Sequence, residues 1–305
     1  FLVGNPDIML YDVMAGRTLY RMAEGEHHAN RGEVLMDEFA ADLISGEIEI
    51  SEWRGGKEGE GRGFAVVSAL KQAEPIENAL QIPPVQLGED QVKSWVHQPV
   101  LERLRAGMGE FLTELRPTVP LFLRFSGIDY DEDPDAGQKL NAYIQAVQAV
   151  IRKEGGNLLE ITVGDKGSYL YISFGACISH EDDARRAVLA ARQLSQLHTG
   201  LGEGAEIQIG ITRGMMRTGE YGGKTRRSYG ALGDDVNLAA RLMSRAAPGE
   251  ILVSRRVHKE LTETAAAKES YSSDGIILEP REPIPLKGKV EPIAVFAVTR
   301  LQQRR

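Results

Sequence analysis

Hydrophobic and polar positions follow strand-like and helix-like patterns in turn over most of the chain. From Val119 onwards, VPLFLRFSGI predicts a strand, AGQKLNAYIQAVQAVIRKEGG a one-sided helix ending at a glycine pair, and LLEITVGDKGSYLYISFG a hairpin turning at Gly164–Gly167. DDARRAVLAARQLSQL predicts a second helix, and EIQIGITRG, ILVSRR and AVFAVTR predict further strands. This order indicates an α+β sandwich with an antiparallel-rich sheet and helices on one face.

The chain before Val119 has a different organisation. The hydrophobic pattern from Phe1 to Leu70 predicts a short strand and a long helix from Asp7 to about Ala29. It also predicts strands in GEVLMDEF, SGEIEISEW and GFAVVSAL. A polar, proline-containing segment then predicts a linker, followed by an amphipathic helix. We therefore predict a partial first domain over 1–70, a linker with a helix over 71–118, and a second domain over 119–305. Because FLVG has the pattern of the middle of a strand, we expect a fragment of a longer protein.

The two predicted domains also resemble each other. FLVGNPDIMLYDVM followed by GEVLMDEF is similar to SYGALGDDVNLAARLM followed by GEILVSRR. Each copy has a glycine after a strand, then a helix, then a GE-containing strand, which indicates an internal repeat. Only the latter half of the first copy is present in this sequence.

Composition narrows the class of protein. The chain of 305 residues is 42% hydrophobic and 26% charged, as in ordinary soluble globular proteins. A net charge of −8 disfavours nucleic acid or an anionic membrane as the main partner. The single cysteine, Cys177, excludes a disulfide framework and fits a reducing compartment, so we expect a cytoplasmic protein. No apolar run is long enough for a membrane span.

The stretch GEYGGKT from Gly219 resembles a phosphate-binding P-loop but has one residue too few before its GKT. SYGAL, which predicts another strand, also separates it from the next helix. In that helix Asn237 and Arg241 lie four positions apart and so share one side. An amide and a guanidinium placed in this way can orient a hydroxyl group and neutralise a phosphate.

These motifs carry a resemblance to a known family. GEYGGKTRRSYGALGDDVNLAARLMSRAAPGEILVS is similar to the signature region of class III nucleotidyl cyclases, and VGDKGSYLYISFG and IPLKGKVEPIAVFAV match their central hairpin and final strands. The resemblance covers Val119 to Thr299 and is strongest to tandem cyclases of the soluble adenylyl cyclase type. It implies a ferredoxin-like βαββαβ catalytic domain, preceded by the C-terminal half of a second cyclase-like domain.

The resemblance also implies a site between two cyclase domains. Asn237 would orient the ribose of ATP, Arg241 would neutralise charge at the α-phosphoryl group, and Lys287, or else Lys289, would hold the terminal phosphates. Gly230 takes the position of one base-reading residue, and Glu160 or Ile161 that of the other. We expect ATP as substrate, with GTP as the alternative.

The metal positions depart from the family pattern. The family holds two Mg²⁺ or Mn²⁺ ions with two aspartates; here the first position is Arg124, and the second is Asp165 in the hairpin turn. Because a cation beside one carboxylate is a poor metal site, we predict no metal ligands in this chain and expect them on the missing upstream half. In the first copy, Ile8 and Asp12 match Asn237 and Arg241.

These losses are complementary and predict one working site, shared with the preceding cyclase domain in the same chain. The fragment alone is expected to be inactive. The second site would be degenerate and open to a regulator. The alternative is an inactive pseudo-cyclase that serves as a regulatory or docking module.

Overall fold

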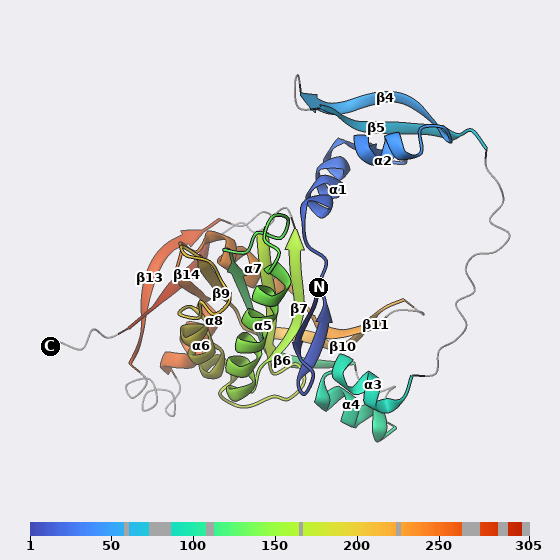
Figure 1. The fold of residues 1–305 in the computed structure, drawn as a ribbon. Coiled ribbons are helices and arrows are strands. Elements are labelled where there is room, and N and C mark those ends of the chain that lie inside the picture. The colour runs from blue at the N-terminus through green and yellow to red at the C-terminus, as the bar shows by residue number, and fades with distance from the viewer. Residues whose placement is uncertain are drawn as a thin grey trace. The chain divides into compact units, whose positions relative to one another are not determined.

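The computed structural model describes residues 1–57, 61–72, 87–107, 113–164, 167–223, 227–263, 275–285 and 292–300 (Figure 1). Its contacts divide the chain into two units. The larger consists of Phe1–Val13, Glu89–Thr162 and Gly167–Arg305, and the smaller of Met14–Gly88 and Val163–Lys166. None of the described helices is long and apolar enough to cross a membrane.

The larger unit is built on a mixed sheet with the strand order β11-β10-β6-β9-β12-β14-β13, with β8 paired to β6 and β7 paired to β8. Its strands are β6 (Glu114–Phe125), β7 (Asn157–Gly164), β8 (Gly167–Phe174), β9 (Ile207–Ile211), β10 (Gly214–Gly222), β11 (Arg227–Leu232), β12 (Ile251–Ser254), β13 (Ile276–Ile284) and β14 (Ile293–Arg300). Its main helices are α5 (Ala136–Lys153), α6 (Asp183–Leu194), α7 (Asp234–Arg245) and α8 (Arg255–Glu263). The strands and helices predicted from Val119 onwards are present in the predicted order, whereas α8 and β13 were not predicted; Arg255 and Arg256, expected at the end of a strand, begin α8.

Helices cover both faces of this sheet, not one as predicted. Phe125 of β6 packs against Tyr143 of α5, with ring centroids 4.7 Å apart. Phe122, an odd number of positions away on the same strand, instead joins a core cluster with Ala239 and Met243 of α7. Because successive side chains of a strand point to opposite faces, α7 lies across the sheet from α5.

The N-terminal segment forms a hairpin where a helix was predicted. Strands β1 (Leu2–Asn5) and β2 (Met9–Asp12) pair in antiparallel fashion, and helix α1 begins only at Arg17. Gln148 of α5 accepts a hydrogen bond from the Asn5 N–H and donates one to the Met9 carbonyl oxygen. These contacts with a distant helix satisfy the hairpin backbone, which explains why local spacing gave the wrong element.

The predicted linker helix is present but short. Helices α3 (Glu89–Val92), η1 (Lys93–Trp95) and α4 (Gln98–Arg105) follow one another in the larger unit. Residues 73–86 and 108–112, where we expected the rest of the linker and the end of the helix, lie outside the described residues.

The smaller unit is a three-stranded antiparallel sheet with two helices. It contains α1 (Arg17–His28), β3 (Val34–Asp37), α2 (Glu38–Leu43), β4 (Ile48–Lys57) and β5 (Gly61–Leu70), and its strand order is β3-β5-β4. Ala41, Ile48 and Ala65 form its buried centre. The strands predicted in GEVLMDEF, SGEIEISEW and GFAVVSAL are confirmed.

The order α1–β3–α2–β4–β5 repeats that of α7–β12–α8–β13–β14. Gly16 precedes α1 as Gly233 precedes α7, and Gly32 precedes β3 as Gly249 precedes β12, with the same spacing in both copies. Gly32 and Gly249 both have positive φ values, +87° and +77°. The sheet orders β3-β5-β4 and β12-β14-β13 also correspond. The structure therefore defines a register for the internal repeat.

This register corrects the positions that we matched from sequence. Tyr20 takes the place of Asn237, and Glu24 that of Arg241. Ile8 lies in the turn between β1 and β2 and Asp12 ends β2, so neither belongs to the helix. The sequence match was wrong because it treated the hairpin as the first part of the helix. Neither tyrosine nor glutamate can replace the asparagine or the arginine, so the conclusion drawn from Ile8 and Asp12 is unchanged.

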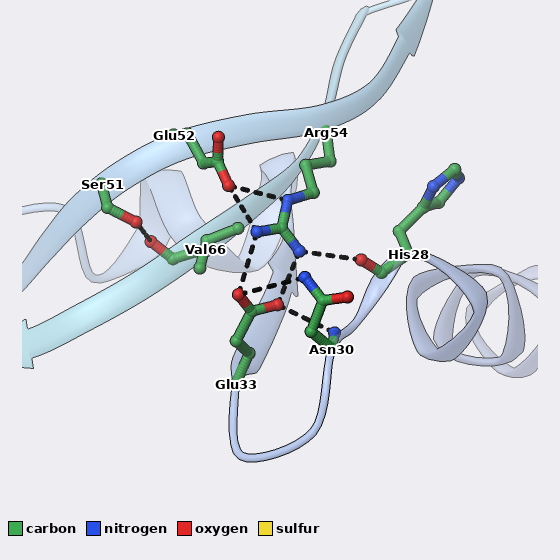
Figure 2. A network of polar contacts seen from close by, with 7 residues as sticks. All are labelled: His28, Asn30, Glu33, Ser51, Glu52, Arg54 and Val66. Carbon is green, nitrogen blue, oxygen red and sulfur yellow. Dashed lines mark hydrogen bonds and ion pairs between the residues drawn. The ribbon is translucent and has the colours of Figure 1, made fainter.

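A network around Arg54 ties the smaller unit together (Figure 2). The Arg54 guanidinium donates to both carboxylate oxygens of Glu33, at 2.5 and 2.9 Å, to Glu52 and to the His28 carbonyl oxygen. It thereby joins β4 to the end of α1 and to the turn before β3. Arg54, together with the Asn30 N–H, lowers the pKa of the Glu33 carboxyl from 4.5 to about 2.

We predict that acid weakens the smaller unit through this carboxyl. Because its pKa is lower in the folded state, the stabilisation is present above about pH 4.5 and is lost as the pH falls towards 2. The protection factors of the β5 amides, which correct for the intrinsic pH dependence of exchange, should therefore fall over this range in the wild type, and their pH dependence should be smaller in Glu33→Gln. Glu49→Gln, an exposed carboxylate on β4, is the control. Equal acid sensitivity in Glu33→Gln and the wild type would contradict the prediction.

Candidate active site on helix α7

Helix α7 is held against the sheet by two glycines. A Cβ at Gly210 of β9 would lie 2.2 Å from the Ala239 carbonyl oxygen and 2.3 Å from the Met243 nitrogen, both in the α7 backbone. A Cβ at Gly214 would overlap the Asp235 carboxylate in the first turn of α7. Such a close approach of helix to strand leaves no room for a side chain, so these glycines set where α7 lies.

The first turn of α7 is anchored further by polar contacts. Thr212 donates a hydrogen bond to the Asp235 carbonyl oxygen at 2.6 Å, and Arg256 forms an ion pair with the Asp235 carboxylate at 2.8 Å. Asp234 and Asp235 both lie in this turn, where the helix dipole favours negative charge. The helix is therefore fixed at the end nearest to Asn237.

Asn237 and Arg241 lie on the exposed side of α7. Ala239, Leu242 and Met243 are buried against the sheet, whereas Asn237 and Arg241 are exposed and one helical turn apart. Within the described part of the chain, neither side chain forms a hydrogen bond or an ion pair. The structure thus presents an unpaired amide and an unpaired guanidinium side by side on a rigid helix.

The predicted base-reading positions lie on β7 and β11. Gly230 lies in β11, the strand that leads directly into α7, and it pairs with Gly219 of β10. The ring of Tyr221, from β10, covers Gly230: a Cβ there would lie 2.7 Å from the tyrosine Cε1. Glu160 and Ile161 lie on β7 and line a cavity of about 810 Å³ that Tyr221 also lines. Sequence reasoning missed Tyr221 because its contact with Gly230 joins two different strands.

Of the two predicted metal positions, the structure describes Arg124. Arg124 pairs in register with Tyr169 and Gln208 and is partly buried. Its Nε would lie 3.0 Å from a Cβ at Gly167, so the guanidinium lies beside the hairpin turn. Asp165 itself lies outside the described residues, among which no group of three or more His, Cys, Asp or Glu side chains could hold a metal ion. A guanidinium at this position opposes cation binding.

The predicted phosphate-holding lysines cannot be placed. Lys287 and its alternative Lys289 both fall within 286–291, outside the described residues. The structure therefore brings Asn237 and Arg241 together on one helix and puts Gly230 on the strand before it. The roles of all five predicted site residues (Asn237, Arg241, Gly230, Asp165 and Lys287) remain predictions.

A known protein family matches the part of the chain that forms the sheet and helix α7. The family described as "Adenylate and Guanylate cyclase catalytic domain" matches residues 134–299, more than half of the chain. The chain belongs to this family. The match includes α7 and the strands before and after it. Members of this family bind nucleotide, use divalent metal ions and act as dimers or pseudo-dimers.

Curated relatives of this cyclase domain are adenylate cyclases. Adenylate cyclase type 10 of Homo sapiens is 24% identical over 157 residues, which is 51% of this chain and 10% of that protein. The Rattus norvegicus protein of the same name is 25% identical over 134 residues, 44% of this chain and 8% of the relative. The chain therefore spans about a tenth of the length of these relatives.

Solved structures show the same fold. The adenylyl cyclase CyaB from P. aeruginosa is similar with a TM-score of 0.52 and 24% identity, over 63% of this chain and 97% of that one. The guanylate cyclase domain of RhGC from Catenaria anguillulae, in complex with GTP, gives a TM-score of 0.51 and 22% identity over 61% and 97% of the two chains. The α+β class III cyclase fold predicted from the sequence is confirmed.

Proposed function

We propose that this chain belongs to an adenylate cyclase that converts ATP to cyclic AMP and pyrophosphate at an interface between two cyclase domains. The observation that carries the proposal is that Asn237 and Arg241 lie exposed on one helix of the cyclase fold, with no side-chain partner among the residues that the structure describes. The preference for ATP over GTP is supported by the two curated relatives described above, which are both named adenylate cyclases. GTP remains the alternative substrate.

In this reaction the ribose 3′-oxygen forms a bond to the α-phosphorus, the bond from that phosphorus to the β-phosphate oxygen breaks, and the hydroxyl proton is lost. Asn237 would orient the ribose through its side-chain amide. Arg241 would donate to the α-phosphoryl oxygens, where negative charge grows, and its planar guanidinium suits two such oxygens. Lys287 would hold the departing pyrophosphate as a compact charge.

The metal ions that cyclases use would be held by the partner domain. Because Arg124 occupies the first aspartate position, this unit does not supply the ligand set, and we assign no step to a metal on this chain. On this proposal the second site of the interface would have Tyr20 and Glu24 where catalysis needs an amide and a guanidinium. One interface site would work, and the other would be degenerate.

The smaller unit supports a partner domain within the same polypeptide. Three of its side chains are exposed at positions that are buried in the second copy. They are Met14, Met22 and Val34, with 73%, 68% and 62% exposure, against 0% for Ala231, 0% for Ala239 and 4% for Ile251. In the second copy, β6, β8, β9 and β10 contribute the residues that cover these positions. We propose that residues 1–70 are the C-terminal half of a cyclase domain whose other half supplies such strands.

A second candidate function is a pseudo-cyclase with a regulatory or docking role. The observation in its favour is the guanidinium of Arg124 at a position where the family binds metal.

Measuring cyclic nucleotide formation by the full-length protein distinguishes an active cyclase from a pseudo-cyclase. With Mn²⁺ and ATP, we expect cyclic AMP and pyrophosphate in equal amounts, and residues 1–305 alone are expected to form neither. GTP in place of ATP tests the base preference. Failure of the full-length protein to form a cyclic nucleotide from either purine would refute the enzyme and leave the pseudo-cyclase.

A further inference from the structure

The predicted base-reading position on β11, Gly230, has no side chain, and the ring of Tyr221 fills the space where one would lie. Gly219 and Gly230 face each other in the β10–β11 ladder, and Tyr221 faces Ser228 two positions further along. Tyr221 and Gly230 are therefore diagonal neighbours on one face of the hairpin, within reach of an aromatic ring. The Tyr221 Cζ and hydroxyl oxygen would each lie 3.5 Å from a Cβ at Gly230.

The strand beside Tyr221 is anchored, and the Tyr221 side chain is partly exposed. Tyr171 of β8 donates a hydrogen bond to the Ala231 carbonyl oxygen at 2.9 Å, which fixes β11 beside Gly230. Tyr221 remains 39% exposed, so part of its ring can meet a ligand. The cavity of about 810 Å³ contains both Tyr221 and Glu160 in its lining.

The cavity has a hydroxyl and a carboxylate in its lining, from Tyr221 and Glu160. Burial, and then the negative charge of Glu160, raise the pKa of the Tyr221 hydroxyl, so it carries its proton at neutral pH. Glu160 itself accepts a hydrogen bond from Thr162 on the same strand at 3.1 Å, which leaves its second oxygen available. A protonated hydroxyl can donate, and an ionised carboxylate can only accept.

We infer that Tyr221, together with Glu160, reads the Watson–Crick edge of the purine, in place of the missing side chain at Gly230. The two purines present opposite patterns on this edge. Adenine has a donor at its 6-amino group and an acceptor at N1, whereas guanine has an acceptor at O6 and a donor at N1–H. With ATP, Glu160 accepts from the 6-amino group and Tyr221 donates to N1. The inference rests on the proposed function only in naming a purine nucleotide as the ligand of this site.

The test compares Tyr221→Phe with the wild-type full-length protein, using ATP and GTP as separate substrates. Removing the hydroxyl leaves a base atom without its partner, so kcat/KM for the preferred purine should fall about tenfold, mainly through KM. The ratio of kcat/KM between the two purines should fall by at least about fivefold. A purely structural role would lower both purines equally and leave this ratio unchanged.

A second variant tests the contact itself. Gly230→Ala keeps the hydroxyl but puts a methyl group where the Tyr221 ring lies, so the ring must move. The purine ratio should shift in the same direction as in Tyr221→Phe. Tyr229→Phe is the matched control, because the Tyr229 hydroxyl already donates to the Ala176 carbonyl oxygen at 2.8 Å. Its purine ratio should equal that of the wild type.

Measuring how tightly the protein binds nucleotide analogues tests this inference independently of the proposed catalytic function. The α,β-methylene analogues of ATP and GTP cannot be cyclised, and their affinities follow from calorimetric titration. Weaker binding of the preferred analogue to Tyr221→Phe supports the inference even if the wild type does not turn over, in which case only the proposed function fails. A purine ratio within twofold of wild type in Tyr221→Phe, or a wild type that binds neither analogue, would overturn it.

Discussion

Replacing Arg241 with alanine is expected to lower ATP turnover by the full-length protein by at least about a hundredfold. Arg241 would donate to oxygens whose negative charge grows only as the bond to the α-phosphorus forms. Removing one such donor from an active site costs about 10²–10³ in kcat. Because the contact strengthens in the transition state, the loss should appear in kcat more than in KM. Asn237→Ala should cause a loss of similar size by leaving the ribose hydroxyl without its partner.

Helix α7 itself provides the control for this experiment. Arg245 lies one turn beyond Arg241 and is also exposed, so Arg245→Ala removes the same charge from the same helix. Its turnover should stay within about threefold of wild type. Steady-state kinetics of the three variants, with melting temperatures measured on the same samples, give the comparison. Arg241→Ala with turnover within fivefold of wild type would refute the proposed role.

Replacing Gly210 with alanine is expected to destabilise the cyclase fold and to impair its site together. The added methyl group would overlap the backbone of Ala239 and Met243, which cannot rotate away as a side chain can, so α7 must shift. Overpacking of this kind costs about 1–3 kcal/mol. A loss of this size lowers the melting temperature of a domain with 150–250 residues by about 2–12 °C.

A displacement of α7 in Gly210→Ala should also displace Asn237 and Arg241, because both residues lie on this helix. We therefore expect turnover of Gly210→Ala to fall by at least about tenfold at a temperature where the protein is folded. Gly223→Ala is the matched control, since a Cβ there meets no atom within 4 Å. An unchanged melting temperature in Gly210→Ala would contradict the close helix–strand contact, and unchanged turnover would contradict its link to the site.

The candidate site could be anticipated in part because it depends on local order. The spacing of Asn237 and Arg241 places them on one side of any helix, and the apolar residues between them decide which side is buried. The structure adds that both are exposed and that Gly210 fixes the helix to the sheet. Tyr221 could not be found in this way, since its neighbour Gly230 is nine positions further along and meets it only across the β10–β11 ladder.

Sequence alone determined the elements whose patterns are local and strongly periodic. The one-sided apolar spacing of α5, the alternation of the β7–β8 hairpin and the VNLAAR motif each follow from residues close together in the chain. They were enough to predict an α+β fold and the pair on α7, and the resemblance of the VNLAAR region to class III cyclases added the cyclase family.

Only the tertiary structure decided features that depend on distant partners. Gln148 of α5 supplies hydrogen bonds that make Leu2–Asp12 a hairpin, although the spacing in this segment suits a helix. That hairpin in turn sets the register in which Tyr20 and Glu24 match Asn237 and Arg241. The physical reason is that backbone groups and apolar faces are satisfied by whichever element packs against them, and a single stretch of sequence does not contain that element.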